Sequence, residues 1–248
     1  MVILPLAEIL FRATLRFGIS GSSAVVQHLT LVIGMLGAAV AAREGRLLTL
    51  STGVSLLSGK PRTAARIFSG AVAVAVTALL AFASYRFLIT ERQAGEILTG
   101  RIPTWVVETV LPLGFALVAL RLLLRASDSW TGRVVAFLLA GLLVRLVAHL
   151  PPAAGGMVLP AFAILLAATV LGAPIFTALG GAALILFWAD SVPIASIPVE
   201  TYRLVVSPTL PTIPLFTLAG YFLAEGGASR RLVRVFSSLA GWIRGGPA

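Results

Sequence analysis

Long apolar runs, separated by short connections that carry most of the charge, make up this chain. The clearest runs cover residues 25–42, 67–87, 103–124 and 134–150. Their lengths match the roughly 17–25 residues that a helix needs to cross a bilayer. A transmembrane barrel would require alternating polar and apolar residues, so the unbroken runs predict membrane-spanning helices.

The basic residues lie in alternate connections between these runs. Residues 43–66 carry five positive charges and one negative, and residues 121–133 carry three and one. Residues 86–101 are close to neutral. Because Lys and Arg are in excess in cytoplasmic loops, we place the two basic connections in the cytoplasm and residues 86–101 on the outer side.

The longest apolar run, residues 157–188, is broken only at Gly172, Ala173 and Pro174. As one helix it would measure about 48 Å, which is too long for a simple crossing. Proline interrupts the hydrogen-bond ladder of a helix, so we expect the chain to turn here and to form two short spans. This division also places the arginines from Arg230 onward in the cytoplasm.

The C-terminal stretch, residues 207–246, is predicted to hold two helices. The proline-containing residues 190–208 form an outer connection that leads into it. The first helix, residues 213–224, is apolar and ends at Glu225, whereas the second, residues 228 to about 243, is basic and amphipathic. An apolar face with arginines elsewhere is typical of a helix in the membrane interface, so we predict a cytoplasmic interfacial arm.

Residues 1–19 form a span or an interfacial helix, and the pattern leaves both open. Glu8, Arg12 and Arg16 recur at four-residue intervals, in the order that favours ion pairs along one face. This stripe either packs against other helices or belongs to an intramembrane ion relay. Together the segments predict an all-α integral membrane protein with about 8 transmembrane helices and a basic interfacial amphipathic helix at the C-terminus.

Composition supports this fold class and argues against several functions. Hydrophobic residues make up 58% of the 248 and charged residues only 11%, against roughly 25% in soluble domains. The net charge of +10 is distributed over the ends of apolar runs rather than in one patch, so nucleic acid is not an expected partner. The chain has no cysteine and no Walker-type phosphate loop, which argues against a thiolate metal site and an ATP-driven pump.

Few side chains suit catalysis. His28 and His149 are the only histidines, and they lie in different predicted spans. A membrane-embedded enzyme would need clustered His, Asp or Glu, so we assign no catalytic residue and no metal ligand, and we do not predict an enzyme. We expect His28 and Glu108, each near the end of a run, to reach the membrane interface.

Two stretches in the first half resemble a known family. They are GMLGAAVAAREGRL, residues 34–47, and GRIPTWVVETVLPLGFALVALRLL, residues 100–123. Both are similar to parts of the small four-helix subunit of a TRAP (tripartite ATP-independent periplasmic) transporter permease. Such subunits usually carry acidic residues where Gln27 and His28 stand, so no charge-dependent role is carried over to these two positions.

Two later stretches resemble the start of the large subunit of the same permease. They are LGAPIFTALGGAAL, residues 171–184, and IPLFTLAGYFLAEGGASRRLVRVFSSLAGWIRGG, residues 213–246. The chain therefore resembles a small subunit fused to the N-terminal part of a large one. The family motif positions, which we expect to be structural, are Gly172, Pro174, Pro214, Phe216, Gly220, Gly226, Gly227, Gly241, Gly245 and Gly246.

The resemblance implies three domains. Residues 1–128 are a small-subunit-like four-helix membrane module, and residues 129–156 are a connecting helix and linker. Residues 157–248 are the N-terminal part of a large-subunit-like transport module, which is incomplete because the family's hairpins that bind sodium and substrate follow it. We therefore assign no substrate-binding residue to this chain.

The resemblance also implies a function. The chain would be a multi-pass permease component of the bacterial inner membrane that imports a small organic acid, driven by a sodium gradient. It would need no cofactor beyond sodium as the coupling ion, whose site lies outside this chain. The implied partners are a periplasmic solute-binding protein, the remainder of the large permease subunit and the lipid bilayer. The alternative is a non-transporting membrane scaffold or interaction protein from a truncated permease gene.

Overall fold

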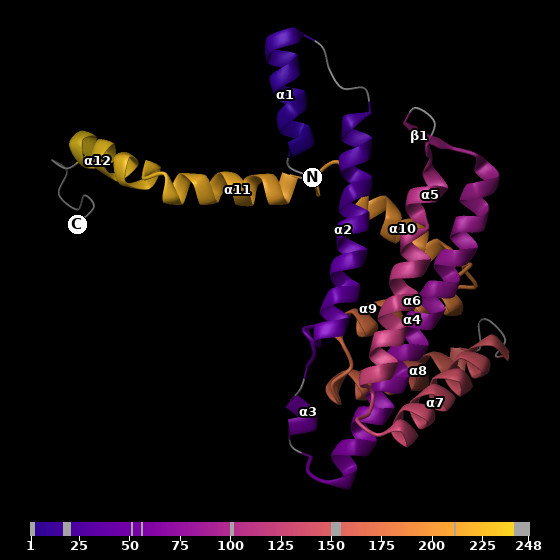
Figure 1. Ribbon diagram of the computed structural model, residues 1–248. Coiled ribbons are helices and arrows are strands. Elements are labelled where there is room, and N and C mark those ends of the chain that lie inside the picture. The colour runs from indigo at the N-terminus through magenta and orange to yellow at the C-terminus, as the bar shows by residue number, and fades with distance from the viewer. Residues whose placement is uncertain are drawn as a thin grey trace. The chain divides into compact units, whose positions relative to one another are not determined.

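The computed structural model describes residues 3–16, 21–50, 52–55, 57–99, 102–149, 155–210 and 212–240, which are mainly helical (Figure 1). The chain forms two compact units. The larger comprises His28–Val206, and the smaller comprises Met1–Gln27 and Ser207–Ala248. We describe each unit by itself.

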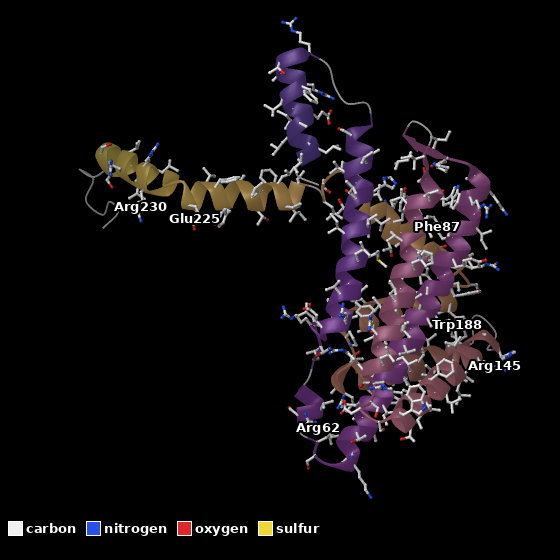
Figure 2. All side chains as sticks on the ribbon, in the orientation of Figure 1. Arg62, Phe87, Arg145, Trp188, Glu225 and Arg230 are labelled. Carbon is white, nitrogen blue, oxygen red and sulfur yellow. The ribbon has the colours of Figure 1, made fainter. Side chains whose placement is uncertain are left out.

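Helix α4 (Lys60–Ala94) is the central element of the larger unit. Its 35 residues extend for about 52 Å, so the helix continues beyond both ends of the apolar run 67–87. It begins after Gly59 and ends at Gly95, whose left-handed backbone and N–H bond to the Glu91 carbonyl close the last turn. In Figure 2, Arg62 lies near one end of α4 and Phe87 towards the other.

The middle of α4 carries small side chains and is buried on nearly all sides by the helices packed around it. Ala71, Ala73, Ala75 and Thr77 are all under 5% exposed. Small residues let neighbouring helices approach closely, as is common in membrane bundles. The buried Thr77 hydroxyl donates to the Ala73 carbonyl at 2.6 Å, so its polar group is satisfied within the helix.

Helices α6 (Val110–Arg125) and α7 (Trp130–His149) pack directly against α4. Helix α2 (Ser22–Glu44), whose first residues belong to the smaller unit, joins them through a hydrophobic cluster of Leu31 with Phe87 of α4 and Leu111 of α6. A short helix, α5 (Thr104–Glu108), leads directly into α6. The predicted spans 25–42, 103–124 and 134–150 are therefore confirmed as helices, with small differences at their ends.

Two shorter helices, α8 (Gly155–Val170) and α9 (Ile175–Ala189), pack against each other and against α4. Between them the chain turns at residues 172–174, where Gly172 has a φ of +102°. Such a backbone is readily adopted only by glycine. The predicted break in the 157–188 run is confirmed.

Other short elements complete the larger unit. Helix α10 (Ser196–Val205) lies within residues 190–208, which we predicted to be a connection without a helix. Helix α3 (Thr52–Ser55) follows α2, and strands β1 (Ile97–Thr99) and β2 (Ile102–Pro103) form an antiparallel pair.

The smaller unit contains α1 (Ile3–Leu15), α11 (Thr212–Glu225) and α12 (Ala228–Ala240). In α1, Arg12 donates to Glu8 at 2.8 Å, which confirms part of the predicted charged stripe. The Ser22 hydroxyl also donates to Glu8. With 13 residues, α1 as described is shorter than a usual span.

The chain between α11 and α12 turns at Gly226 and Gly227, with Glu225 before it and Arg230 after it (Figure 2). Gly227 has a φ of +69°, which ends α11 and redirects the chain. In α12, Leu232, Val235 and Phe236 are exposed apolar residues. The predicted alternation of an apolar helix and a basic amphipathic one is confirmed to Ala240.

Four helical segments among the described residues are long and apolar enough to cross a membrane: Ser22–Glu44, Lys60–Ala94, Thr104–Arg125 and Trp130–His149. Three shorter apolar helices accompany them. The predicted class, a predominantly helical protein with membrane-spanning helices, is thus confirmed, whereas a total of about 8 spans stays a prediction.

Candidate functional site: the junction between the two parts of the chain

The candidate site is the region where residues 157–206 pack against residues 28–128. A single hydrophobic core joins the two parts. Val72, Val76 and Leu80 of α4 contact it from one side, and Leu165 of α8 and Leu184 of α9 from the other. Glycines bring the helices close, because a Cβ at Gly181 would lie 2.7 Å from a methyl of Leu165. The two parts therefore form one packed body in this region.

Backbone contacts hold the 172–174 turn to the segment that follows α2. The N–H of Ile175 donates to the Leu48 carbonyl at 2.9 Å, and Thr49 and Pro174 form an isolated antiparallel bridge. Nearby, a Cβ at Gly53 would lie 2.5 Å from the Val170 carbonyl oxygen. The loop after α2 thus fixes the turn between α8 and α9.

A polar cluster lies at a second contact between the two parts. The Tyr202 hydroxyl of α10 is 2.7 Å from Nε2 of His28 in α2, within hydrogen-bond distance. The Tyr202 ring also contacts the Phe87 ring of α4, with centroids 5.7 Å apart. His28 is only 5% exposed, so the expectation of an interfacial histidine is wrong. Helix α10 covers it, and no sequence pattern had predicted that helix.

Glu108, at the end of α5, is the third polar member of this cluster. Its side chain is fully buried, and neither carboxylate oxygen has a hydrogen-bond partner among the residues that the structure describes. The expectation that Glu108 reaches the interface is therefore wrong. Burial raises the pKa of the Tyr202 phenol, and the neighbouring Glu108 carboxylate raises it further. The Tyr202 hydroxyl accordingly keeps its proton and remains a donor.

Charged residues near the end of α4 lie next to this cluster. The charges of Glu91 and Glu96 also raise the pKa of the Tyr202 phenol, by less than burial and Glu108 do. Arg92 lies over the Trp105 ring, with its guanidinium carbon 5.4 Å from the ring centroid. This contact is a cation–π interaction and positions a positive charge at the same end of α4 as the two acids.

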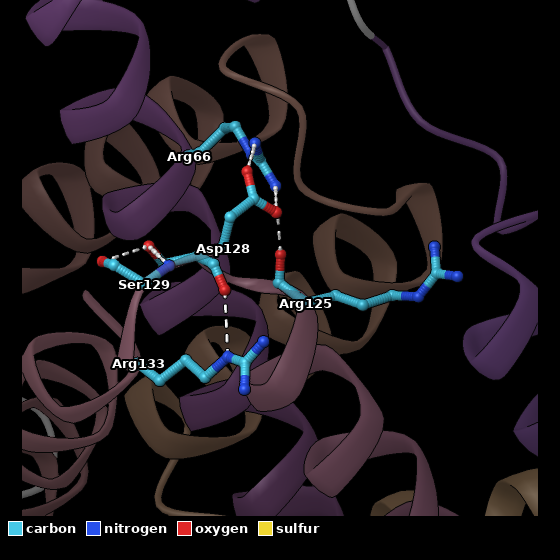
Figure 3. Close-up of polar contacts among 6 residues, drawn as sticks. Arg66, Arg125, Asp128, Ser129 and Arg133 are labelled. Atoms are coloured by element: carbon cyan, nitrogen blue, oxygen red, sulfur yellow. Dashed lines mark hydrogen bonds and ion pairs between the residues drawn. The ribbon is translucent and has the colours of Figure 1, made fainter. Parts of the chain in front are cut away.

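A second polar network lies at the other end of α4 (Figure 3). Arg66 of α4 donates to Asp128 through both terminal nitrogens, at 2.9 and 3.4 Å, and to the Arg125 carbonyl at 3.5 Å. Arg133 of α7 donates to the Ser127 carbonyl at 3.0 Å. The hydrogen bond and the charge of Arg66 lower the pKa of Asp128, with a smaller effect from Arg133. The network ties the α6–α7 turn to α4.

The structure places the predicted motif residues at turns and in α11. Gly172 and Pro174 form the turn that contacts Leu48 and Thr49. The others are distributed over the smaller unit or lie outside the described residues. Pro214, Phe216 and Gly220 belong to α11, Gly226 and Gly227 form the turn after it, and Gly241, Gly245 and Gly246 lie outside the described residues. Their structural role stays a prediction.

Sequence reasoning missed the association of His28, Tyr202 and Glu108. The available signal was an acid inside an apolar run, since a buried charge is costly and usually functional. The partners gave no signal, because they lie on helices far apart in the chain.

Comparisons with known proteins divide the chain in a similar way. Residues 1–132 match the family described as "Tripartite ATP-independent periplasmic transporters, DctQ component". Residues 162–248 match "Tripartite ATP-independent periplasmic transporter, DctM component". No solved structure matches the chain.

Two curated relatives carry names of the same transporter type. The isethionate TRAP transporter permease protein DctMQ of Oleidesulfovibrio alaskensis is 32% identical over 160 residues, which is 60% of this chain and 24% of the relative. The C4-dicarboxylate TRAP transporter large permease protein DctM of Vibrio cholerae is 33% identical over 89 residues, 35% of this chain and 20% of the relative. The aligned segments span only about a fifth to a quarter of these relatives.

Proposed function

Because this chain belongs to the TRAP transporter permeases, with a small subunit fused to the start of a large one, we propose that it is the membrane permease component of a transporter for small organic acids. The observation that carries this proposal is the hydrophobic core shared by α4, α8 and α9. A small-subunit part that packs this closely on the large-subunit part is suited to act as its fixed scaffold.

The names of the relatives support an organic anion as substrate. One relative is named for C4-dicarboxylates and another for isethionate. Transporter sites are typically built from broken helices in paired repeats near the middle of the membrane. The short helices α8 and α9, joined at a glycine–proline turn, would then precede such a site in the chain.

We further propose an energy source, a partner protein and a membrane orientation for the permease. A sodium gradient drives import, and a periplasmic solute-binding protein delivers the acid to the permease. The basic connections 43–66 and 121–133 face the cytoplasm, in keeping with their excess of positive charge. The basic amphipathic helix α12 then lies on the cytoplasmic surface of the bacterial inner membrane.

Transport by the reconstituted permease tests the proposal. The complete gene product and its binding protein are placed in and around proteoliposomes, and uptake of radiolabelled succinate and isethionate is followed. We expect uptake of one of these anions only with an inward sodium gradient and with the binding protein present. Equal uptake without the gradient would contradict sodium coupling. No uptake by correctly inserted protein would favour the non-transporting scaffold.

A further inference from the structure

A cavity lies at the basic end of the larger unit, between the two parts of the chain. Its volume is about 170 Å³, several times the roughly 30 Å³ that one molecule occupies in liquid water. Residues after α2, the end of α6 and the 172–174 turn line it. The lining includes apolar side chains, such as Leu47 and Leu122, beside the arginines Arg66 and Arg125. The cavity is therefore amphipathic.

Among the described residues, Arg125 contributes an unpaired positive charge to the lining of this cavity. Its carbonyl accepts a hydrogen bond from Arg66, but its guanidinium has no ion pair or hydrogen bond within the part of the chain that the structure describes. In Figure 3 the Arg125 side chain points away from Arg66 and Asp128. It lies against Gly45, where an added Cβ would collide with Nη1. Glycine at position 45 thus leaves room for the guanidinium.

The two acidic residues at this end of the larger unit already form ion pairs with other arginines. Asp128 pairs with Arg66, and Glu44 pairs with Arg46 at 3.1 Å. The two connections 43–66 and 121–133 together hold eight basic residues and these two acids. The local excess of positive charge therefore has no counter-ion among the described residues. An anion from outside the chain would balance it.

We propose that this cavity binds a phosphate group, as carried by the head group of an anionic phospholipid, with the Arg125 guanidinium as its main contact. Arginine presents planar paired donors that match the oxygens of a phosphate. Basic pockets at the ends of membrane helices are suited to anionic head groups, and Leu47 and Leu122 offer apolar surface to the rest of a lipid. This inference does not depend on the transported substrate or on sodium coupling.

Direct binding to the purified, lipid-depleted protein in detergent tests the site. The probes are dioctanoyl phosphatidylglycerol, dioctanoyl phosphatidylcholine and inorganic phosphate, and native mass spectrometry measures occupancy at each concentration. We expect phosphatidylglycerol to bind more tightly than phosphatidylcholine. Arg125→Gln should weaken phosphatidylglycerol binding by at least about tenfold, because a charge-assisted hydrogen bond is lost. Inorganic phosphate that binds with the same dependence on Arg125 would support the site but assign a soluble source.

Arg62→Gln is the matched control. It removes one positive charge at the same basic end of the larger unit, but Arg62 lines neither this cavity nor the neighbouring pocket beside Asp128. We expect Arg62→Gln to change the affinity less than twofold. An equal loss in both variants would reduce the effect to general attraction, and an unchanged affinity in Arg125→Gln would remove the site; either result overturns the proposal.

Arg125→Lys keeps the inference testable if Arg125→Gln fails to fold. Lysine retains the charge but not the planar donors, so an affinity several-fold weaker than that of the wild type is expected. Because the Arg125 backbone, not its side chain, accepts the bond from Arg66, both variants should elute at the wild-type position in gel filtration. A lysine variant that binds phosphatidylglycerol as tightly as the wild type would contradict the assigned geometry.

Discussion

The hydroxyl of Tyr202 and Nε2 of His28 are 2.7 Å apart, although 174 positions separate the two residues in the chain. Tyr202 belongs to the large-subunit part and His28 to the small-subunit part. Their contact therefore joins the two parts by a specific polar interaction in addition to the shared hydrophobic core. The ring centroids of the pair lie 5.7 Å apart in an edge-to-face arrangement.

Removing the Tyr202 hydroxyl should measure what this contact contributes. Tyr202→Phe keeps the ring against Phe87 but leaves His28 without its bond to the phenol. We expect a loss of about 1 kcal/mol, or about 2–4 °C in the melting temperature of a chain of this size. Thermal unfolding of the purified protein in detergent checks this.

A double-mutant cycle tests whether the effect belongs to the pair. In the His28→Ala background, Tyr202→Phe should cost much less than in the wild type, because its partner is already absent. Additive losses would mean that Tyr202 and His28 act independently.

Glu108→Gln should separate stability from transport. The buried carboxyl group lacks a hydrogen-bond partner among the described residues, and a buried ionisable group without a partner is costly. Glutamine occupies nearly the same volume but cannot ionise. We expect an unchanged or higher melting temperature together with a transport rate at least about tenfold lower, since intramembrane acids are generally functional.

Glu108→Ala is the control for packing at this position. It removes the whole buried side chain, so its melting temperature should fall below that of Glu108→Gln. Wild-type transport by a stabilised Glu108→Gln variant would show that the acid has no part in transport.

The sequence predicted the elements that depend on local pattern. Apolar runs located the long helices, and the glycine–proline break at residues 172–174 was placed correctly because proline and a left-handed glycine act locally. The true ends of α4 were missed, since its first and last turns are polar and look like connections. Helix α10 was missed because prolines concealed it, although Pro198 sits in its first turn, where proline is tolerated.

The polar cluster of His28, Tyr202 and Glu108 could not be predicted from the sequence, for a different reason. Glu108 was visible as an acid in an apolar run, but its neighbours come from α2 and α10, and nothing local to those segments indicates a contact. Pairing across such a separation is set by tertiary packing. The same holds for Arg125, whose position in the cavity depends on Gly45, the residue that follows α2.

Alanine at Gly172 and at Gly34 should have opposite effects on stability. Gly172 has a φ of +102°, and the nearest atom to an added Cβ is a Val54 methyl at an ordinary 3.5 Å, so the penalty comes from the backbone. We expect Gly172→Ala to lower the unfolding free energy by about 1–3 kcal/mol. Gly34 lies inside α2 with no atom within 4 Å of an added Cβ, so Gly34→Ala should raise it by about 0.5–1 kcal/mol. Equal melting temperatures for the two variants would contradict the left-handed turn.

Asp128→Asn should destabilise the protein only where Asp128 is ionised. Arg66 lowers the pKa of Asp128 in the folded protein, so the pair contributes stability above the unfolded pKa of about 3.9 and loses it as the pH falls through the lower folded value. We therefore expect a lower melting temperature for Asp128→Asn than for the wild type at pH 7, and a difference that shrinks towards zero in increasingly acidic buffer. The effect should be small, because the pair is solvent-exposed, and it should diminish in high salt. A difference that stays constant from pH 7 into this acidic range would show that the asparagine acts through something other than the lost charge.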